Sequence, residues 1–373
     1  MSTTTEATLS TVGQLRSYIA PAAPATRTPC DGSESDLRVE YGFTPLWYRA
    51  NCDVDFSERW HLDPLYRGET LVRMRRELNR RFPSLQLGGA NPEAAPSTLD
   101  GVHGAVTMSR IFGVGAEYYP DNWPAARHEY LSEARIKTLE VPDLSANPVF
   151  VQIMEQADLI ERHFGRIEGY INWQGVLNNA FRIRGDQIFI DLMMDPGLAC
   201  HLFEVVTRTM ISGMKLLYAR QRETGVIVRH ATVSNCVVNM VSPDQYREFI
   251  LPYDRMLSEA FEHFGIHNCA WNVDPYIDDY ASIDKLGYVD MGMDSNLKRA
   301  RELCPRARRA VMYRPTDLTG KSVDELTADL ARIRRELSPC DIVMADIEAD
   351  TPDERVLDLA RLVEATLDIP PDA

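Results

Sequence analysis

The sequence predicts a single (β/α)8 barrel preceded by an N-terminal arm. Short β-branched runs alternate with longer amphipathic segments, always in the order strand then helix, and 373 residues are enough for eight such units. Six units are plain, and we expect their strands at 166–173, 226–234, 265–271, 287–293, 308–315 and 340–347. An open, doubly wound sheet is the alternative arrangement of the same units.

The elements before residue 166 are less regular. Residues 1–38 are rich in Ser, Thr, Ala and Pro, which predicts a partly ordered arm ahead of a barrel domain at 39–373. A helix near 65–81 and an apolar patch at 102–108 are the candidates for two further units. Later helix starts are clear, because Ser242-Pro243-Asp244 and Thr351-Pro352-Asp353 each combine an N-cap hydroxyl, a proline and an acid.

The composition excludes several classes of function. The chain has 55 acidic and 40 basic side chains and a net charge of −15, so it repels phosphate backbones and anionic lipid surfaces. No run approaches the ~18 apolar residues of a membrane span, and the start MSTTTEATLSTVGQL does not resemble a signal peptide. We therefore expect a cytoplasmic protein without nucleic-acid or membrane partners. The 7 cysteines, an odd number, indicate reduced thiols.

Polar side chains close most of the expected strands. In a parallel barrel the active site lies at the C-terminal ends of the strands, so this pattern favours an enzyme with a polar pocket. We select Tyr170, Asp294 and Arg314 as catalytic candidates. The candidates for substrate binding are Arg49, Tyr118, Trp173, Gln174, Asn178 and Trp271.

Two segments supply most of the substrate-binding candidates. In 169–185, the side chains of Trp173, Gln174 and Asn178 could hydrogen-bond an amide or a carboxylate, although a half-buried loop is an equal alternative. Tyr118 belongs to an aromatic stretch at 112–124 that we expect to form a lid or a pocket wall. That stretch lacks a Gly-x-Gly-x-x-Gly run, which argues against a dinucleotide site.

The sharpest chemical signal is His267-Asn268-Cys269. Residues i and i+2 of an extended strand face the same way, so the imidazole and the thiol can reach one metal ion. The pair is half of a tetrahedral zinc site. A His-x-Cys pair can also be two buried side chains that bind no metal. The flanking sequence is needed to distinguish these two interpretations.

That flanking sequence, SPDQYREFILPYDRMLSEAFEHFGIHNCAW at 242–271, resembles the uroporphyrinogen decarboxylase superfamily. A Ser-Pro helix start, a Leu-Pro-Tyr segment and a His-x-Cys strand recur there in this order. With GYVDMGMD at 287–294 and the later Thr-Pro helix start, the resemblance covers roughly residues 145 to 367 and implies a (β/α)8 barrel. Two branches share the pattern: the porphyrinogen decarboxylase, and methyltransferases that move methyl groups between a corrinoid protein and a thiol.

Departures from the superfamily pattern favour the methyltransferase branch. The decarboxylase anchors substrate carboxylates with an Arg-Gln-Ala-Gly-Arg signature, whereas the corresponding TPLWYRANCD has the single arginine Arg49. The methyltransferases bind zinc through His-x-Cys and a later cysteine. His267 and Cys269 match the first two ligands, but MADIEADTP at 344–352 has no cysteine.

We expect Asp346 to replace the missing thiolate, because zinc also accepts carboxylate oxygens. Such a site should bind zinc less tightly than a two-thiolate site and accept harder ions more readily. The further candidates for a remaining ligand are Asp294, Cys236 and Cys340.

The resemblance implies a zinc-dependent methyltransferase acting on a small molecule. The corrinoid methyl donor would be supplied in trans, because the chain has no Asp-x-His-x-x-Gly run of the kind that binds cobalamin. The expected partners are a small-molecule substrate, a corrinoid carrier protein and a second copy of the chain.

Two other functions stay open. One is a lyase, most simply a decarboxylase of a small carboxylic acid that Arg49 or Arg314 would hold, with an acidic residue handling the proton. The other is a non-catalytic corrinoid- or tetrapyrrole-binding protein.

Overall fold

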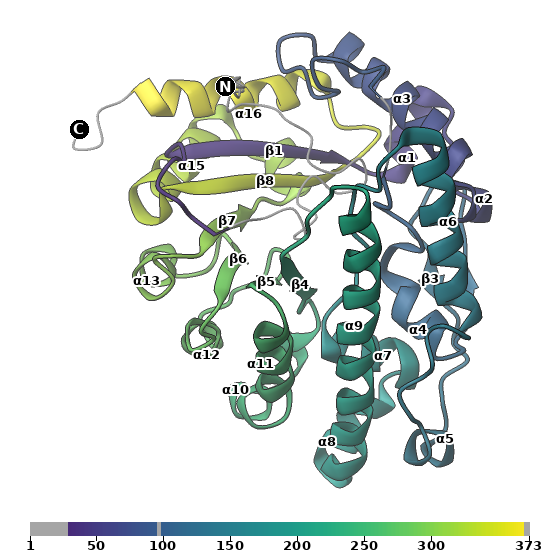
Figure 1. Cartoon of the computed structure of the whole chain (residues 1–373). Coiled ribbons are helices and arrows are strands. Elements are labelled where there is room, and N and C mark those ends of the chain that lie inside the picture. Colours follow the sequence, from purple (N-terminus) through teal and green to yellow (C-terminus); the bar gives the residue numbers. More distant parts are fainter. Residues whose placement is uncertain (1–28, 95–97, 369–373) are drawn as a thin grey trace, which may run out of the picture.

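The computed structural model describes residues 29–94 and 98–368 (Figure 1). Most of the expected arm therefore lies outside the described residues. Residues 29–36 run beside the sheet, where the Cys30 amide donates to the Arg306 carbonyl at 3.2 Å. The first strand begins at Leu37, inside the segment that we assigned to the arm.

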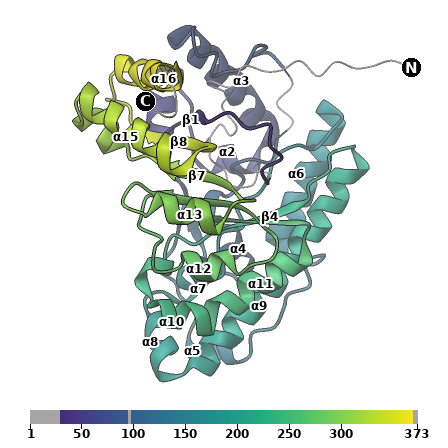
Figure 2. The ribbon, with the colours of Figure 1, turned by 90° about the vertical axis from the view of Figure 1, so that its left-hand side faces the viewer.

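Six strands form one parallel sheet in the order β1-β8-β7-β6-β5-β4. The chain runs between neighbouring strands through helices, and Figure 2 shows α16, α15, α13, α12, α11, α9 and α6 following one another around the strands. The predicted α/β class is thereby confirmed. The strands of this sheet are β1 (Leu37–Phe43), β4 (His230–Ser234), β5 (His263–His267), β6 (Leu286–Gly292), β7 (Arg308–Met312) and β8 (Cys340–Ile347), and β2 (Ala116–Glu117) and β3 (Ala125–Ala126) form a separate hairpin.

The helices begin mostly at proline or at a capped residue, as the sequence indicates. Asp63 caps the helix that we expected at 65–81 by accepting from the amides of Leu65 and Tyr66. None of the helices within the described residues is long and apolar enough to cross a membrane. The α-helices are α1 (Pro45–Cys52), α2 (Glu58–Leu62), α3 (Pro64–Arg81), α4 (Thr107–Ile111), α5 (Glu133–Lys137), α6 (Pro148–Phe164), α7 (Val176–Arg184), α8 (Gln187–Met194), α9 (Pro196–Glu223), α10 (Pro243–Gln245), α11 (Leu251–Ala260), α12 (Ile277–Ala281), α13 (Leu297–Leu303), α14 (Pro315–Gly320), α15 (Val323–Leu337) and α16 (Asp353–Asp368).

The expected strand at 166–173 and the candidate unit at 102–108 contribute no strand to the sheet. Residues 166–173 do not form a strand, and the patch at 102–108 is helical. Instead, residues 98–100 and 167–173 run side by side, joined by one parallel bridge between Thr98 and Glu168. Gly169 explains the irregularity, because its φ of +87° breaks the extended backbone and a Cβ there would lie 2.3 Å from the Thr98 hydroxyl. Within the described residues, the hydrogen-bonded sheet therefore has six strands rather than the expected eight.

The sheet separates two apolar clusters. The smaller one, the inner cluster, contains Tyr288, Ala310, Met312, Val343 and Ala345. Alternate residues of β7 and β8 contribute to it, so it lies on the face of the sheet turned away from the covering helices. The larger cluster fills the space between strands and helices.

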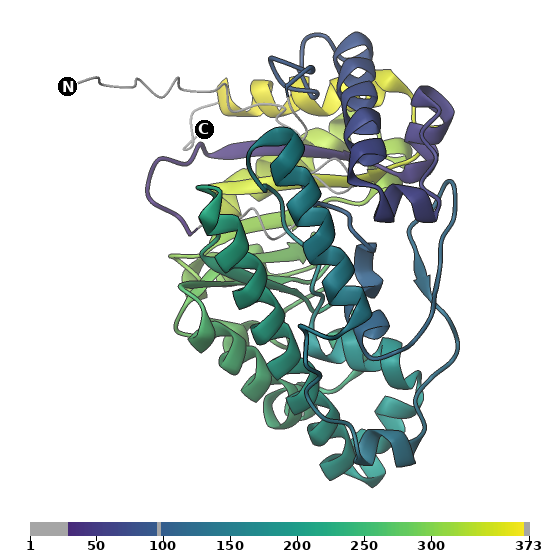
Figure 3. The ribbon, with the colours of Figure 1, turned by 45° about the vertical axis from the view of Figure 1, so that its right-hand side comes forward.

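Trp173 belongs to the larger cluster and lies against the helical layer. It is completely buried, and a Cβ at Gly213 of α9 would lie 2.7 Å from the Trp173 ring. The same Cβ would lie 3.4 Å from Phe150 of α6. Figures 1 and 3 show α6 and α9 side by side, and Trp173 packs against α9 at Gly213, where Phe150 of α6 also lies. The expected role of Trp173 in substrate binding is therefore corrected.

This packing predicts that Gly213→Ala destabilises the protein although alanine favours helices. The methyl group overpacks the Trp173 ring, and we expect the free energy of unfolding to fall by about 1–3 kcal/mol. Gly197→Ala, in the first turn of the same helix, is the control, because its Cβ would meet only Asp195 at 3.5 Å. Urea denaturation should show a loss for Gly213→Ala alone. Equal stability of both variants would contradict the proposed packing.

Candidate metal centre

The C-terminal ends of β4 and β5 lie next to each other and carry the site. Ser234, the last residue of β4, is in register with His267, the last residue of β5. The Asn235 amide then donates to the His267 carbonyl at 2.7 Å, which holds the chain after β4 close to β5. This register brings Cys236 to the two residues that the sequence singled out.

Cys236, His267 and Cys269 form one cluster of possible metal ligands. The two Sγ atoms are 2.8 Å apart, and Cys269 Sγ lies 3.2 Å from His267 Nε2. All three ligand atoms lie within 4.8 Å of one another, so a single ion could contact them together. The pairing of His267 with Cys269 was predicted from the sequence, whereas Cys236 was only a secondary candidate.

The backbone brings Cys269 to His267 in a different way from the one expected. β5 ends at His267, and Cys269 has a left-handed backbone with φ of 60°. Alternation along an extended strand is therefore not the cause of their proximity. A non-glycine residue in this region is strained by roughly 1–2 kcal/mol, and such residues concentrate at functional sites.

Asp346 lies outside this cluster, so its assignment as the third ligand is corrected. β7 and β6 separate β8 from β5 in the sheet. Ala345 points into the inner cluster, and Asp346, with φ of 58°, is exposed to solvent. Partial burial of the Asp346 carboxyl and the charge of Glu348 raise its pKa, whereas the charge of His267 lowers it, so the carboxyl is within electrostatic reach of the cluster.

The expectation of a single thiolate is also corrected, because Cys236 supplies a second sulfur. Cys340, the last-ranked alternative ligand, is buried at the start of β8 and thus at the opposite end of the sheet. The sequence carried a usable signal for Cys236: it follows a β-branched run that immediately precedes the His-x-Cys strand in the chain.

A buried carboxylate orients His267. Asp290 of β6 is fully buried and accepts a hydrogen bond from His267 Nδ1 at 2.6 Å. It also accepts from the Asn268 amide at 2.6 Å and from the Tyr288 hydroxyl at 2.8 Å. Since Nδ1 is occupied, Nε2 is the nitrogen that faces the thiols. A histidine held by a carboxylate in this way is typical of metal sites.

The charges in the cluster favour a thiolate at Cys236. Burial lowers the pKa of the His267 imidazole, but the charge of Asp290 and the two thiols outweigh burial and raise that pKa well above its usual range. A hydrogen bond from Cys269 and the charge of His267 lower the pKa of Cys236 despite its burial. The same hydrogen bond and burial raise the pKa of Cys269.

Hydrogen bonds hold both sides of Cys236. On one side, Asn235 donates to the buried Asp254 of α11 at 3.0 Å. Burial raises the pKa of Asp254 to about 6, although hydrogen bonds from Tyr246 and Asn235 oppose this shift. On the other side, the Val237 amide donates to Asn178 Oδ1 of α7 at 3.1 Å.

Gln174 and Asn178 act on the cluster through the chain after β4. Asn178 donates to Gln174 Oε1 at 3.1 Å, and both side chains are almost completely buried. Their expected role in binding substrate stays a prediction, and in the structure Asn178 also holds the segment that follows Cys236.

Arg182, which the sequence analysis missed, lies beside the thiols. Burial lowers the pKa of its guanidinium, while the charges of Cys236 and Cys269 raise it. Its Nη1 donates to the Asn178 carbonyl at 3.1 Å, and none of the carboxylates in the described segments forms an ion pair with it. The spacing of Asn178 and Arg182, one helical turn apart, was the available signal.

Tyr170 is not placed for catalysis. Its hydroxyl accepts from the Thr232 amide at 3.0 Å and its ring stacks on His230 at 5.6 Å. Burial raises the pKa of Tyr170 to about 12. The side chain thus connects the irregular segment 167–173 to β4, and the expected catalytic role is corrected.

The remaining candidates lie apart from the three ligands. Asp294 and Arg314 form an exposed ion pair at 3.8 Å, and Arg314 also binds Asp317. Arg49 lies on the exposed side of α1, 3.9 Å from Asp55.

Two aromatic candidates have distinct surroundings. Tyr118 contacts His103 Nδ1 through its hydroxyl at 3.1 Å. Trp271 packs edge-on against Tyr276 at 5.5 Å, and its indole nitrogen is buried without a hydrogen-bond partner. Trp271 follows Cys269 by two residues and thus stays a candidate for binding substrate.

Comparisons with known proteins find similarity in fold but not in sequence. No family model matches the chain, and no curated protein resembles its sequence. Among solved structures, a methyltransferase from Methanosarcina mazei is similar with a TM-score of 0.62 over 92% of this chain and 95% of that chain. The two sequences are 16% identical, so the likeness shows the fold.

We expect Asp290→Asn to lower zinc affinity by about 10–100-fold, the usual cost of losing such a carboxylate partner. The amide cannot hold the imidazole with a charge, so Nε2 becomes a weaker and less well oriented ligand. Competition with a chromophoric chelator measures the affinity. Asp279→Asn is the control, because Asp279 is a buried acid that pairs with Arg247 away from the cluster. Unchanged affinity in a folded Asp290→Asn protein would refute the orienting role.

Proposed function

We propose that this protein is a zinc-dependent methyltransferase that acts on a small molecule at the C-terminal ends of β4 and β5. The observation that carries the proposal is the convergence of Cys236, His267 and Cys269. The fold shared with a methyltransferase supports it. The order of the Ser-Pro, Leu-Pro-Tyr and His-x-Cys motifs supports membership of the uroporphyrinogen decarboxylase superfamily, in its corrinoid-dependent branch.

The donor set fits zinc. Two sulfurs and one imidazole nitrogen are ligands that zinc prefers over harder ions, and three protein ligands leave a fourth position for substrate. When bound, zinc would lower the pKa of a substrate thiol and so supply the thiolate nucleophile. Asp290 keeps His267 in the orientation that exposes Nε2, and the hydrogen bonds of Asn235 and Val237 keep Cys236 beside it.

Two further side chains equip the site for its substrate. Arg182 brings to the two thiols a cation that no carboxylate of residues 29–94 and 98–368 pairs with, which suits a substrate with an acidic group. Asp346 supplies a solvent-facing carboxylate that can take the proton released when a thiol binds. The methyl donor is a corrinoid carried by another protein.

The decarboxylase alternative has less support. Its proposed carboxylate anchors, Arg49 and Arg314, are exposed and already face Asp55, Asp294 and Asp317. The cluster of three metal ligands has no role in that reaction.

We expect about one zinc per chain after purification with zinc present, the stoichiometry of a single tetrahedral site. Cys236→Ser should lose most of this zinc, because it removes one of two thiolates. Asp346→Ala and Cys340→Ser should keep it. Elemental analysis by mass spectrometry measures the content. Zinc loss in Asp346→Ala together with full retention in Cys236→Ser would restore Asp346 as the ligand and overturn the cluster.

We expect methylcobalamin, used as donor, to lose its methyl group to small thiols when the zinc-loaded protein is present. Cys269→Ala should reduce kcat by at least about 100-fold, because the metal ligand is gone. Arg182→Gln should raise KM about tenfold for 3-mercaptopropionate, the worth of one charge-assisted hydrogen bond, and leave KM for 2-mercaptoethanol nearly unchanged. The absorbance of methylcobalamin follows the reaction. Transfer at full rate without zinc would exclude the proposed function.

A further inference from the structure

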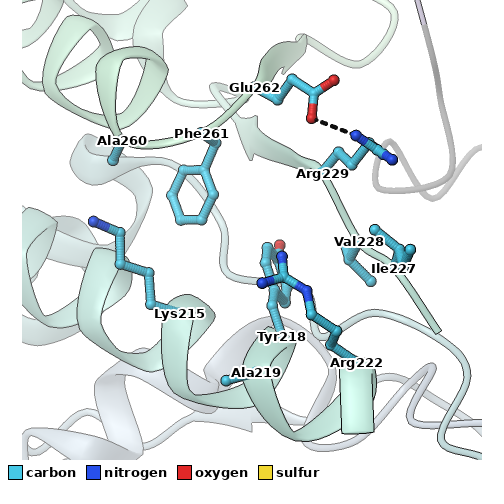
Figure 4. Close-up of a pocket in the computed structure, with 10 residues that line it drawn as sticks. All are labelled: Lys215, Tyr218, Ala219, Arg222, Ile227, Val228, Arg229, Ala260, Phe261 and Glu262. Atoms are coloured by element: carbon cyan, nitrogen blue, oxygen red, sulfur yellow. Dashed lines mark hydrogen bonds and ion pairs between the residues drawn. The ribbon is translucent and has the colours of Figure 1, made fainter. Parts of the chain in front are cut away.

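A second concave site lies at the opposite end of the sheet from the metal centre. Helix α9 forms one wall, and the segments that lead into β4 and β5 form the other (Figure 4). We call this site the basic groove; it is lined by Lys215, Tyr218, Ala219, Arg222, Ile227, Val228, Arg229, Ala260, Phe261 and Glu262. Because β4 begins at His230 and ends at Ser234, roughly 13 Å of strand separates the groove from Cys236.

Two cations in the basic groove have no ion-pair partner among the described residues. Lys215 and Arg222 lie two helical turns apart on the same face of α9, about 10 Å along the axis. Both are exposed, and neither forms an ion pair with any described carboxylate. Arg220, between them in sequence, contrasts with them, since it is paired with Asp158, Glu161 and Glu223.

The third cation of the groove is already neutralised. Arg229 forms an ion pair with Glu262 at 2.9 Å on the wall opposite α9, as Figure 4 shows. The excess positive charge thus comes from Lys215 and Arg222 alone. In a chain with a net charge of −15, two cations without an ion-pair partner among the described residues give the groove a local attraction for anions that the chain as a whole repels.

Apolar surface lies between the charges. Ile227 is 55% exposed although it is a large aliphatic side chain. In Figure 4 the rings of Phe261 and Tyr218 and the side chain of Val228 face the same space as Arg222. The groove has a volume of about 420 Å³, which is within the range of small-molecule sites.

We propose that the basic groove binds an organic anion, a small carboxylate with an aromatic or aliphatic body. Lys215 and Arg222 hold the acid group, and Phe261 and Ile227 pack against the body of the ligand. The site is separate from the metal centre and serves as an effector site rather than as a substrate site, because no cysteine, histidine, serine or threonine is among the residues that line it. It does not depend on the proposed methyl transfer.

Binding of 2-naphthoate to the full-length, zinc-loaded protein tests this proposal by titration calorimetry. We expect a dissociation constant of 1 mM or below, and a loss of at least tenfold in affinity in the double variant Lys215→Glu, Arg222→Glu. The matched control is Arg208→Glu, a charge reversal on the same helix outside the groove. All three substitutions are at exposed positions, and circular dichroism and the melting temperature confirm that the variants fold.

Two further measurements separate the parts of the proposal. Ile227→Ser should weaken binding of 2-naphthoate and leave that of inorganic phosphate unchanged, because only the naphthalene ring uses the apolar wall. The Cys269→Ser variant should bind 2-naphthoate with the affinity of the unaltered protein, whether or not it still transfers methyl groups. Equal affinity of the double variant and the unaltered protein would overturn the site. Inorganic phosphate binding as tightly as 2-naphthoate would overturn the assignment of an organic anion.

Discussion

The buried carboxylate of Asp290 is the constraint on which the cluster of Cys236, His267 and Cys269 depends. A charged group without water is costly unless donors surround it, and Asp290 meets this requirement with three hydrogen bonds. These bonds come from a ligand side chain, from the backbone next to it and from Tyr288 of its own strand. Removing the charge would therefore disturb the imidazole, the turn to Cys269 and the β5–β6 connection together.

The turn after β5 is fixed from a second direction. Asn268 donates to the Asp290 carbonyl at 2.8 Å and accepts from the Tyr280 hydroxyl at 2.9 Å. This fully buried asparagine sits between the two ligands of the His-x-Cys motif, which explains how a strained left-handed Cys269 can be maintained. The middle residue of the motif is thus as much part of the site as the ligands.

The sequence predicted the parts of the molecule that depend on periodicity. Alternating strands and helices from β4 to β8 could be recognised because each has a regular apolar pattern and several have capped helix starts. The irregular segment 167–173 could not, because Gly169 interrupts an otherwise β-branched run. The predicted roles of Tyr170 and Trp173 were wrong for the same reason. They assumed the alternation of a regular strand, which does not show which way a ring faces in an irregular segment.

Only part of the candidate site could be predicted from the sequence, for a related reason. His267 and Cys269 are close in sequence, whereas Cys236 meets them through the register of β4 with β5, which no local pattern encodes. Asp346 was the converse case, a residue chosen by analogy that does not belong to the group of three ligand atoms. Arg182 escaped notice because its partners, the thiols, lie on other elements.

The site has two parts that are held in different ways. One part extends from strand β5, and the other lies on α7 after the irregular segment 167–173. His267 and Cys269 extend from a strand with ladder hydrogen bonds on both sides. Helix α7, which carries Asn178 and Arg182, follows the segment 167–173, whose parallel pairing to its neighbour is a single bridge. Local opening is easiest where backbone hydrogen bonds are fewest. The turn with His267 and Cys269 is therefore held by the sheet, whereas Cys236 and the wall with Arg182 are held through Asn178.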